Sequence, residues 1–131
     1  MQHEQGVLSR LAQQQRIVAI DQIQQKRRVS EEVQSLIRLQ QKPESYLNRY
    51  DQLFRLISLW LLVRCYDLSN QQPHQVLKAI CLLQCPHCDV EKMIQRRHQL
   101  KKGALAVIES ALSEDLERCY QLFLENLQAY I

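Results

Sequence analysis

The sequence predicts an all-α protein, a single-domain up-and-down bundle of five to six helices over residues 1–131. Three observations support this class. The strong helix formers Ala, Leu, Met, Gln, Glu, Lys and Arg make up 76 of the 131 residues. Only 2 Gly and 3 Pro interrupt the chain. Apolar residues also recur at helical spacing along most of its length. This composition argues against a β-sandwich or a Rossmann-type sheet.

The first segment, residues 1–28, is rich in Gln and is expected to be helical with one interruption. Leu8 and Ile17 belong to two apolar faces, and their nine-residue separation is about half a turn out of phase. We therefore expect a bend or break near residues 13–16. The second face would consist of Ile17, Ile20 and Ile23.

The remaining residues, 30–131, are expected to form the main bundle. Ser30 resembles an N-cap, because two acids follow it in the first turn. Pro43 suits the first turn of the next helix. That helix, at about residues 44–66, is apolar on nearly all sides, which predicts the central element of the core. Asp67 to Gln72 then forms a polar turn.

The second half should contain three helices separated by short interruptions. Pro73 opens the first, and residues 85–88 end it. Cys88 or Asp89 caps the second, which continues at least to Lys102. Gly103 either terminates that helix or is tolerated within a longer one. Ser113 is expected to cap the final helix.

The charge pattern shows a basic segment followed by an acidic one. The net charge of +3 is too small to indicate nucleic-acid binding by itself. Residues 92–102 contain five Lys or Arg and no acid, whereas residues 109–131 contain five acids and one Arg. These segments are either solvated faces that pair with each other, or the basic one binds a ligand.

The expected location is the cytoplasm, without membrane insertion. The five cysteines are odd in number, and residues 1–20 contain no apolar signal-peptide core. The longest apolar stretch, residues 56–63, is interrupted by Ser58 and falls short of the roughly 20 residues that span a bilayer.

The cysteine-rich segment could carry redox or metal chemistry. Residues 85–88 (Cys-Pro-His-Cys) match a thioredoxin-like motif, but the sequence offers no strands for that fold. Cys81, Cys85 and Cys88 have the spacing of radical-SAM iron–sulfur ligands, yet the chain is too short for that barrel. Zinc is chemically more plausible, and His87, His98 or His74 could complete a site. A single CxxC is a weak signal, so we expect no bound metal or other cofactor.

The basic helix face offers a stronger indication of function. With Val90 at 0° and steps of about 100°, Ile94, Arg97 and Lys101 fall on one apolar stripe, and Arg96, His98 and Lys102 fall at its edges. An inward-facing guanidinium must be paired, line a cleft or lie at an interface. Arg97 is therefore either a structural ion-pair partner or a contact for a phosphate-bearing ligand.

Several stretches of the chain also carry a resemblance to a known family. They are residues 50–54 (YDQLF), 59–66 (LWLLVRCY), 69–74 (SNQQPH), 96–100 (RRHQL) and 113–116 (SEDL). Over about residues 30–131 the chain resembles the HEPN superfamily. The resemblance implies a four- to five-helix bundle, a homodimer and a toxin–antitoxin or defence context. Active HEPN RNases have an Arg followed four to six residues later by His, a pattern that is absent here, so the resemblance implies no catalysis.

Two binding functions remain open from the sequence, beside a third hypothesis, an enzyme or zinc protein that uses the cysteine cluster and that metal analysis would test. The first is a non-catalytic HEPN-like domain that binds RNA, a nucleotide or a partner protein through the basic helix face. Its candidate ligand contacts are His74, Arg96, Arg97, His98, Lys101 and Lys102. The second is a helical interaction or adaptor domain that binds no nucleic acid. Salt dependence distinguishes the two, because phosphate contacts weaken steeply with salt and apolar packing does not.

Overall fold

The computed structural model describes residues 4–104 and 107–131, which form six α-helices, a short 3-10 helix and two very short strands. The elements follow one another along the chain as α1 (Glu4–Gln13), β1 (Ile17–Ala19), α2 (Gln22–Gln40), α3 (Tyr46–Val63), β2 (Tyr66–Leu68), α4 (Pro73–Gln84), α5 (Val90–Lys101), α6 (Ser110–Asn126) and η1 (Gln128–Tyr130). The predicted all-α class and the predicted number of helices are confirmed.

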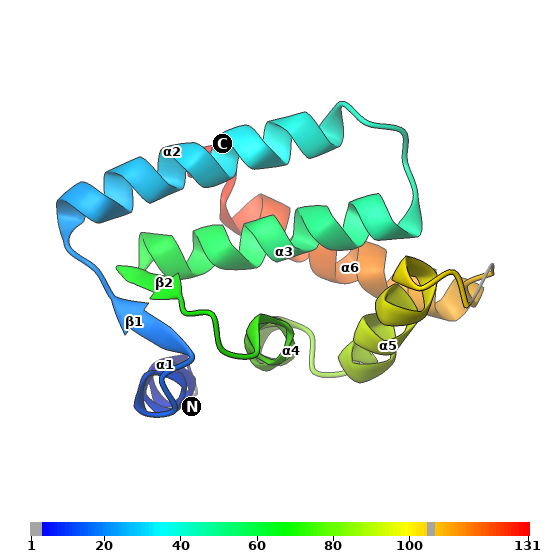
Figure 1. The fold of residues 1–131 in the computed structure, drawn as a ribbon, viewed down its shortest axis with the longest axis horizontal. Helices are drawn as coiled ribbons and strands as arrows, with labels where there is room; N and C mark the ends of the chain where they lie inside the picture. Colours follow the sequence, from blue (N-terminus) through cyan, green and yellow to red (C-terminus); the bar gives the residue numbers. More distant parts are fainter. Residues whose placement is uncertain (1–3, 105–106) are drawn as a thin grey trace.

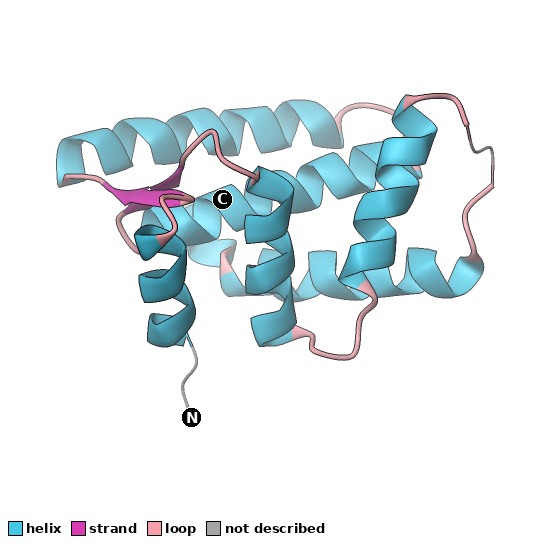
Figure 2. Cartoon of the chain, turned by 60° about the horizontal axis from the view of Figure 1, so that its bottom comes forward, coloured by secondary structure: helices cyan, strands magenta, loops and turns pink. Residues whose placement is uncertain are grey.

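The helices lie in two layers that cross each other. Figure 1 shows α2 running along α3, with α6 behind α3, and these three helices are roughly aligned. Figure 2 shows α1, α4 and α5 side by side, running across the direction of the first three. This crossing places the beginning of α4 and the face of α5 beside the middle of α3.

Helix α3 is the centre of the core, as its all-round apolar pattern predicts. Its residues from Leu56 to Leu62 are all buried, and Trp60 is only 1% exposed. It contacts α2 and α6 of its own layer and α4 and α5 of the other layer. Such a helix gains stability from apolar burial on every side.

Strands β1 and β2, which were not predicted from the sequence, pair as a two-stranded antiparallel ladder. The ladder joins the segment after α1 to the segment after α3. Ile17 pairs with Leu68, and Ala19 pairs with Tyr66. The expected break near residues 13–16 is confirmed, because α1 ends at Gln13. The proposed helical face of Ile17, Ile20 and Ile23 is wrong. Gln15 and Cys65 have positive φ angles and lie just before β1 and β2, respectively. The β-branched residues of β1 favour its extended backbone.

Two predicted helix starts are also wrong. Helix α2 begins eight residues before Ser30, because Asp21 caps it by accepting a hydrogen bond from the Gln24 backbone N–H at 2.8 Å. Ser30 therefore lies inside the helix, which crosses the expected boundary between residues 28 and 30. Helix α6 begins at Ser110 rather than after Ser113, and the early start buries Leu112.

Pro43 was expected in the first turn of the next helix, but it lies in the loop before α3, which starts after the N-cap Ser45. The other predicted boundaries are confirmed closely. Pro73 opens α4, and Asp89 caps α5 by accepting a hydrogen bond from the Lys92 backbone N–H at 3.1 Å. Gly103 has a φ of 72°, the left-handed conformation that terminates a helix, so the shorter α5 is the correct alternative.

Among residues 4–104 and 107–131, no helix combines the length and apolar character needed to cross a membrane.

Candidate anion-binding pocket

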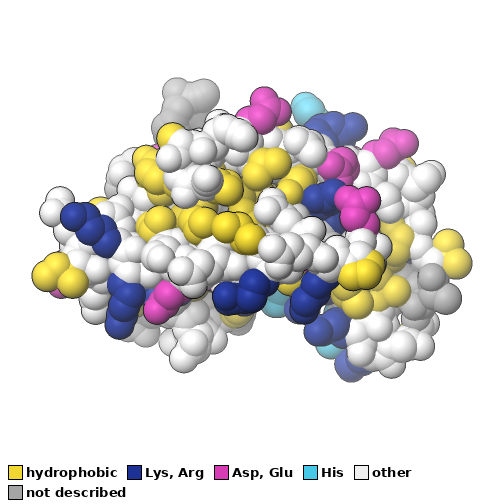
Figure 3. Space-filling view, turned by 90° about the horizontal axis from the view of Figure 1, so that it is seen from above, with side chains coloured by type: hydrophobic (Ala, Val, Ile, Leu, Met, Phe, Trp, Pro, Cys, Tyr) yellow, Lys and Arg dark blue, Asp and Glu magenta, His cyan; other side chains and the backbone are white. Residues whose placement is uncertain are grey.

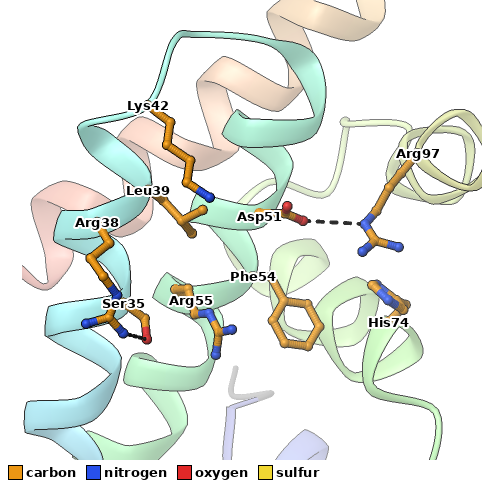
Figure 4. Close-up of a pocket in the computed structure, with 9 residues that line it drawn as sticks. All are labelled: Ser35, Arg38, Leu39, Lys42, Asp51, Phe54, Arg55, His74 and Arg97. Atoms are coloured by element: carbon orange, nitrogen blue, oxygen red, sulfur yellow. Dashed lines mark hydrogen bonds and ion pairs between the residues drawn. The ribbon is translucent and has the colours of Figure 1, made fainter. Parts of the chain in front are cut away.

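The candidate site is an open pocket of about 430 Å³ between α2, α3, α4 and α5. We call it the basic pocket. Nine residues line it: Ser35, Arg38, Leu39, Lys42, Asp51, Phe54, Arg55, His74 and Arg97. Four of them are Lys or Arg, and one is an acid. Figure 4 shows residues of α2 on one side, residues of α3 in the middle, and His74 and Arg97 on the other side.

Helical spacing brings the pocket residues together. Ser35, Arg38 and Leu39 are three and four residues apart near the end of α2, so they share one face. Asp51, Phe54 and Arg55 repeat the same spacing on α3. The remaining lining residues come from other helices and are brought close only by tertiary packing. The crossing of the two layers adds one side chain each from α4 and α5, and these complete the far wall.

Two of the four pocket cations have carboxylate partners. Arg97 Nε lies 3.6 Å from an Asp51 carboxylate oxygen, and Arg55 donates a hydrogen bond to the buried Glu32 carboxylate at 3.0 Å. The net charge of each of these two Arg–carboxylate pairs is therefore close to zero.

The other two cations are Arg38 and Lys42, at the end of α2. Arg38 donates a hydrogen bond to the Ser35 hydroxyl at 3.1 Å. Within residues 4–104 and 107–131, neither Arg38 nor Lys42 forms an ion pair with a carboxylate. The basic pocket therefore has an excess of two positive charges, which favours an anion. Figure 3, seen from the α2 side, shows Lys and Arg side chains gathered along the lower edge of the molecule.

Arg97 points inward, as its helical angle predicts. Its side chain is 22% exposed, and its guanidinium carbon lies 5.3 Å from the centre of the Tyr50 ring. The buried Nε has no hydrogen-bond partner at normal distance among the described residues, because the contact to Asp51 is long. Figure 4 shows the guanidinium directed into the space beside His74. Arg97 therefore pairs with an acid and also lines a pocket, and its contact with a phosphate-bearing ligand stays a prediction.

His74 forms the neutral part of the pocket wall. Its Nδ1 lies 2.8 Å from the Tyr50 hydroxyl, and its ring packs against Phe54 at 5.2 Å between centroids. Burial, together with the positive charge of Arg97, lowers the pKa of His74 below its usual 6.5. Burial raises the pKa of Tyr50, so the phenol remains protonated, and the tautomer of His74 decides which of the two groups donates the hydrogen bond.

The other predicted ligand residues lie outside the basic pocket. Arg96 forms a two-point ion pair with Glu109, at 3.0 and 2.9 Å, and this contact fixes the start of α6 against α5. It also lowers the pKa of Glu109 to about 2. His98, Lys101 and Lys102 are exposed. Lys101 was expected on the apolar stripe, but α5 ends there and its side chain reaches solvent.

The cysteines form a separate cluster on the other side of α4. The Sγ atoms of Cys85, Cys88 and Cys119 all lie within 4.8 Å of one another, and all three residues are buried. His87 is exposed and does not belong to this cluster. Cys119 was not predicted to take part, because it lies thirty-one residues beyond Cys88 and only the docking of α6 brings it close.

Three of the four pocket cations, Arg38, Lys42 and Arg55, were not predicted from the sequence. The available signal was weak: Arg38 and Lys42 are four residues apart, as two cations on one helix face would be. Nothing in the sequence placed this face opposite Arg97.

No family model matches the chain, and comparisons with curated proteins and with solved structures found no match either.

Proposed function

We propose that this domain binds a phosphate-bearing ligand, a nucleotide or RNA, in the basic pocket and does not catalyse a reaction. The observation that carries the proposal is the convergence of Arg38, Lys42, Arg55 and Arg97 on one cavity with a single acid in its lining. Guanidinium groups match phosphate oxygens in two-point geometry, and a cavity of this size accommodates a small ligand. HEPN membership and the associated toxin–antitoxin or defence context rest on the resemblance in sequence and remain predictions.

Binding is favoured over catalysis by the state of His74. Within the described lining it is the residue whose ordinary pKa is nearest neutrality, as a general base requires. Its Nδ1 is already engaged by the Tyr50 hydroxyl, and its pKa is lowered. The pattern of active HEPN RNases is also absent from the chain.

The test removes the two cations that have no ionic role in the fold. Arg38 and Lys42 are exposed at the end of α2, so the double variant Arg38→Ala/Lys42→Ala should remain folded. We expect it to bind ATP and a short single-stranded RNA at least tenfold more weakly than the unmodified protein. Each lost RNA contact should also flatten the logarithmic salt slope by about 0.7.

The matched control is Arg27→Ala, an exposed residue on the same helix that does not line the basic pocket. It should leave binding unchanged. ATP binding without RNA binding would identify a nucleotide pocket, and the reverse result would identify an RNA surface. If neither probe binds the unmodified protein, or if Arg27→Ala weakens binding as much as the double variant, the proposal is wrong.

A second candidate function, association with another protein chain, is favoured by an apolar groove. Val29 and Val33 of α2, Val63 of α3 and Tyr130 of η1 form the apolar part of a cavity of about 460 Å³. The rest of its lining is polar: Gln25, Lys26, Ser30 and Gln34. Figure 3 shows hydrophobic side chains in a stripe across the α2 side of the molecule. The expected homodimer would use this groove. Sedimentation of the protein and of Val33→Asp would show a dimer that dissociates on substitution, whereas a monomer at high concentration would exclude it.

A further inference from the structure

Three buried thiols converge where the end of α4 meets α6. Cys85 and Cys88 are 6% and 5% exposed, and Cys119 is fully buried. Their three Sγ atoms lie within 4.8 Å of one another. Two of the residues come from the turn after α4, whereas Cys119 comes from the middle of α6, so tertiary packing creates the cluster.

The backbone of residues 85–88 forms a tight turn that directs two thiols to one point. Cys85 ends α4, and its N–H donates to the Cys81 carbonyl at 2.8 Å. The Cys88 N–H then donates to the Cys85 carbonyl at 3.2 Å. This turn has the two-residue spacing that presents paired cysteines to a metal ion.

A fourth thiol adjoins the three. Cys81 lies one helical turn before Cys85 and is fully buried. Its thiol is near enough to raise the pKa of Cys119, but it is not among the three sulfur atoms that all lie within 4.8 Å of one another, so it must move closer to complete the site. Four sulfur atoms are therefore available from two helices and one turn. This number matches the ligand count of a tetrahedral structural zinc site.

We propose that Cys85, Cys88 and Cys119 bind one Zn²⁺ ion, with Cys81 as the fourth ligand. Zn–S bonds of about 2.3 Å place tetrahedral sulfur atoms about 3.8 Å apart. The three Sγ atoms, already within 4.8 Å of one another, need only a small contraction to reach this spacing. On binding, each thiol releases its proton to solvent, a Zn–S bond forms in its place, and no electron is transferred. This proposal replaces the expectation from sequence that no metal is bound.

The surroundings suit a negatively charged metal–thiolate centre. Arg118 Nη1 lies 3.8 Å from Cys88 Sγ, and the same nitrogen donates to the Asp115 carboxylate at 2.9 Å. The other Asp115 oxygen accepts from the Asp89 backbone N–H at 3.0 Å. The cation therefore offsets part of the thiolate charge, and its position is fixed by contacts that join the turn to α6.

A catalytic dithiol is a poorer interpretation of the same cluster. Reactive cysteines are partly exposed and have a lowered pKa, whereas burial raises the pKa of Cys85 and of Cys88. A disulfide between any two of Cys85, Cys88 and Cys119 would use only part of this cluster, whereas a soft divalent ion uses all three of its thiols at once.

The direct test measures metal on the full chain purified in reducing buffer without chelators. Elemental analysis should find one zinc per chain. After zinc removal, Co²⁺ should produce the visible absorption of a tetrahedral thiolate site, and Zn²⁺ should displace it. Zinc should also raise the unfolding temperature of the unmodified protein, and Mg²⁺ should not. This last measurement needs no variant, so it holds even if a cysteine substitution prevents folding.

The variants identify the ligands. Cys85→Ser, Cys88→Ser and Cys119→Ser should each weaken Co²⁺ binding at least tenfold. Cys81→Ser should do the same. The matched control is Cys65→Ser, since Cys65 is neither in the cluster nor the proposed fourth ligand. Failure of the reduced, unmodified protein to bind zinc or Co²⁺ would overturn the site. Undiminished Co²⁺ absorption in Cys81→Ser would overturn the fourth ligand.

Discussion

Replacing Asp51 by Asn should strengthen anion binding by the basic pocket. Asp51 is the acid in the lining, and it lies 3.6 Å from Arg97. We take a separation of about 6 Å between a bound anion and this carboxylate for the Coulomb estimate. At an effective dielectric constant of about 40–80 for an open pocket, the repulsion is about 0.7–1.4 kcal/mol per phosphate charge. Removing it should lower the dissociation constant for ATP by about three- to tenfold.

The stability of Asp51→Asn should change little, because the Asp51 side chain is 37% exposed and its ion pair is solvated. A loss of no more than about 1 kcal/mol is expected in denaturant unfolding. Titration calorimetry with ATP at low salt measures the binding. The matched control is Glu44→Gln, which removes an exposed carboxylate outside the basic pocket and should not affect affinity. Unchanged or weaker ATP binding by a folded Asp51→Asn protein would refute the reasoning.

Further predictions concern the fold. Trp60→Ala should lower the free energy of unfolding by about 3–5 kcal/mol, and a loss below about 1 kcal/mol would show that Trp60 is not in the core. Glu32→Gln should cost about 1–3 kcal/mol, because the buried carboxylate is paired with Arg55; an unchanged denaturation midpoint would contradict this. The pKa of His74 is lowered on folding, so the unfolded chain binds its proton more tightly. The contribution of neutral His74 to the free energy of unfolding should be fully present above about pH 6.5 and be lost as the pH falls below it. The variant His74→Gln should flatten this pH profile, whereas the exposed control His98→Gln should not.

The sequence was most informative where one helix carries its own signals. The all-round apolar pattern of residues 44–66 identified the core helix, and Pro73, Asp89 and Gly103 marked real boundaries. Ser30 and Ser113 misled because Ser is tolerated inside a helix that starts earlier, as α6 does without a side-chain cap at Glu109. The side chain of Asp21 provides an earlier cap for α2. Local propensity could not decide between two candidate starts.

The two candidate sites depend on packing, so the sequence revealed only parts of them. Arg97 and His74 were found individually, but Arg38, Lys42 and Arg55 joined them only through the crossing of the helix layers. In the same way, Cys85 and Cys88 were visible as a pair, and Cys119 became their neighbour only when α6 docked. Spacing along one helix predicts which residues share a face, but it does not predict which other helix packs against that face.

The ladder between β1 and β2 has a consequence for the order of folding. It closes a loop of about 50 residues that contains α2 and α3, and closing a flexible loop of that length carries a substantial entropy cost for few hydrogen bonds. Once α2 and α3 have paired as a helical hairpin, the chain ends of that loop are already close. The ladder should therefore form after the nucleus, and weakening it should accelerate unfolding while leaving the refolding rate nearly unchanged.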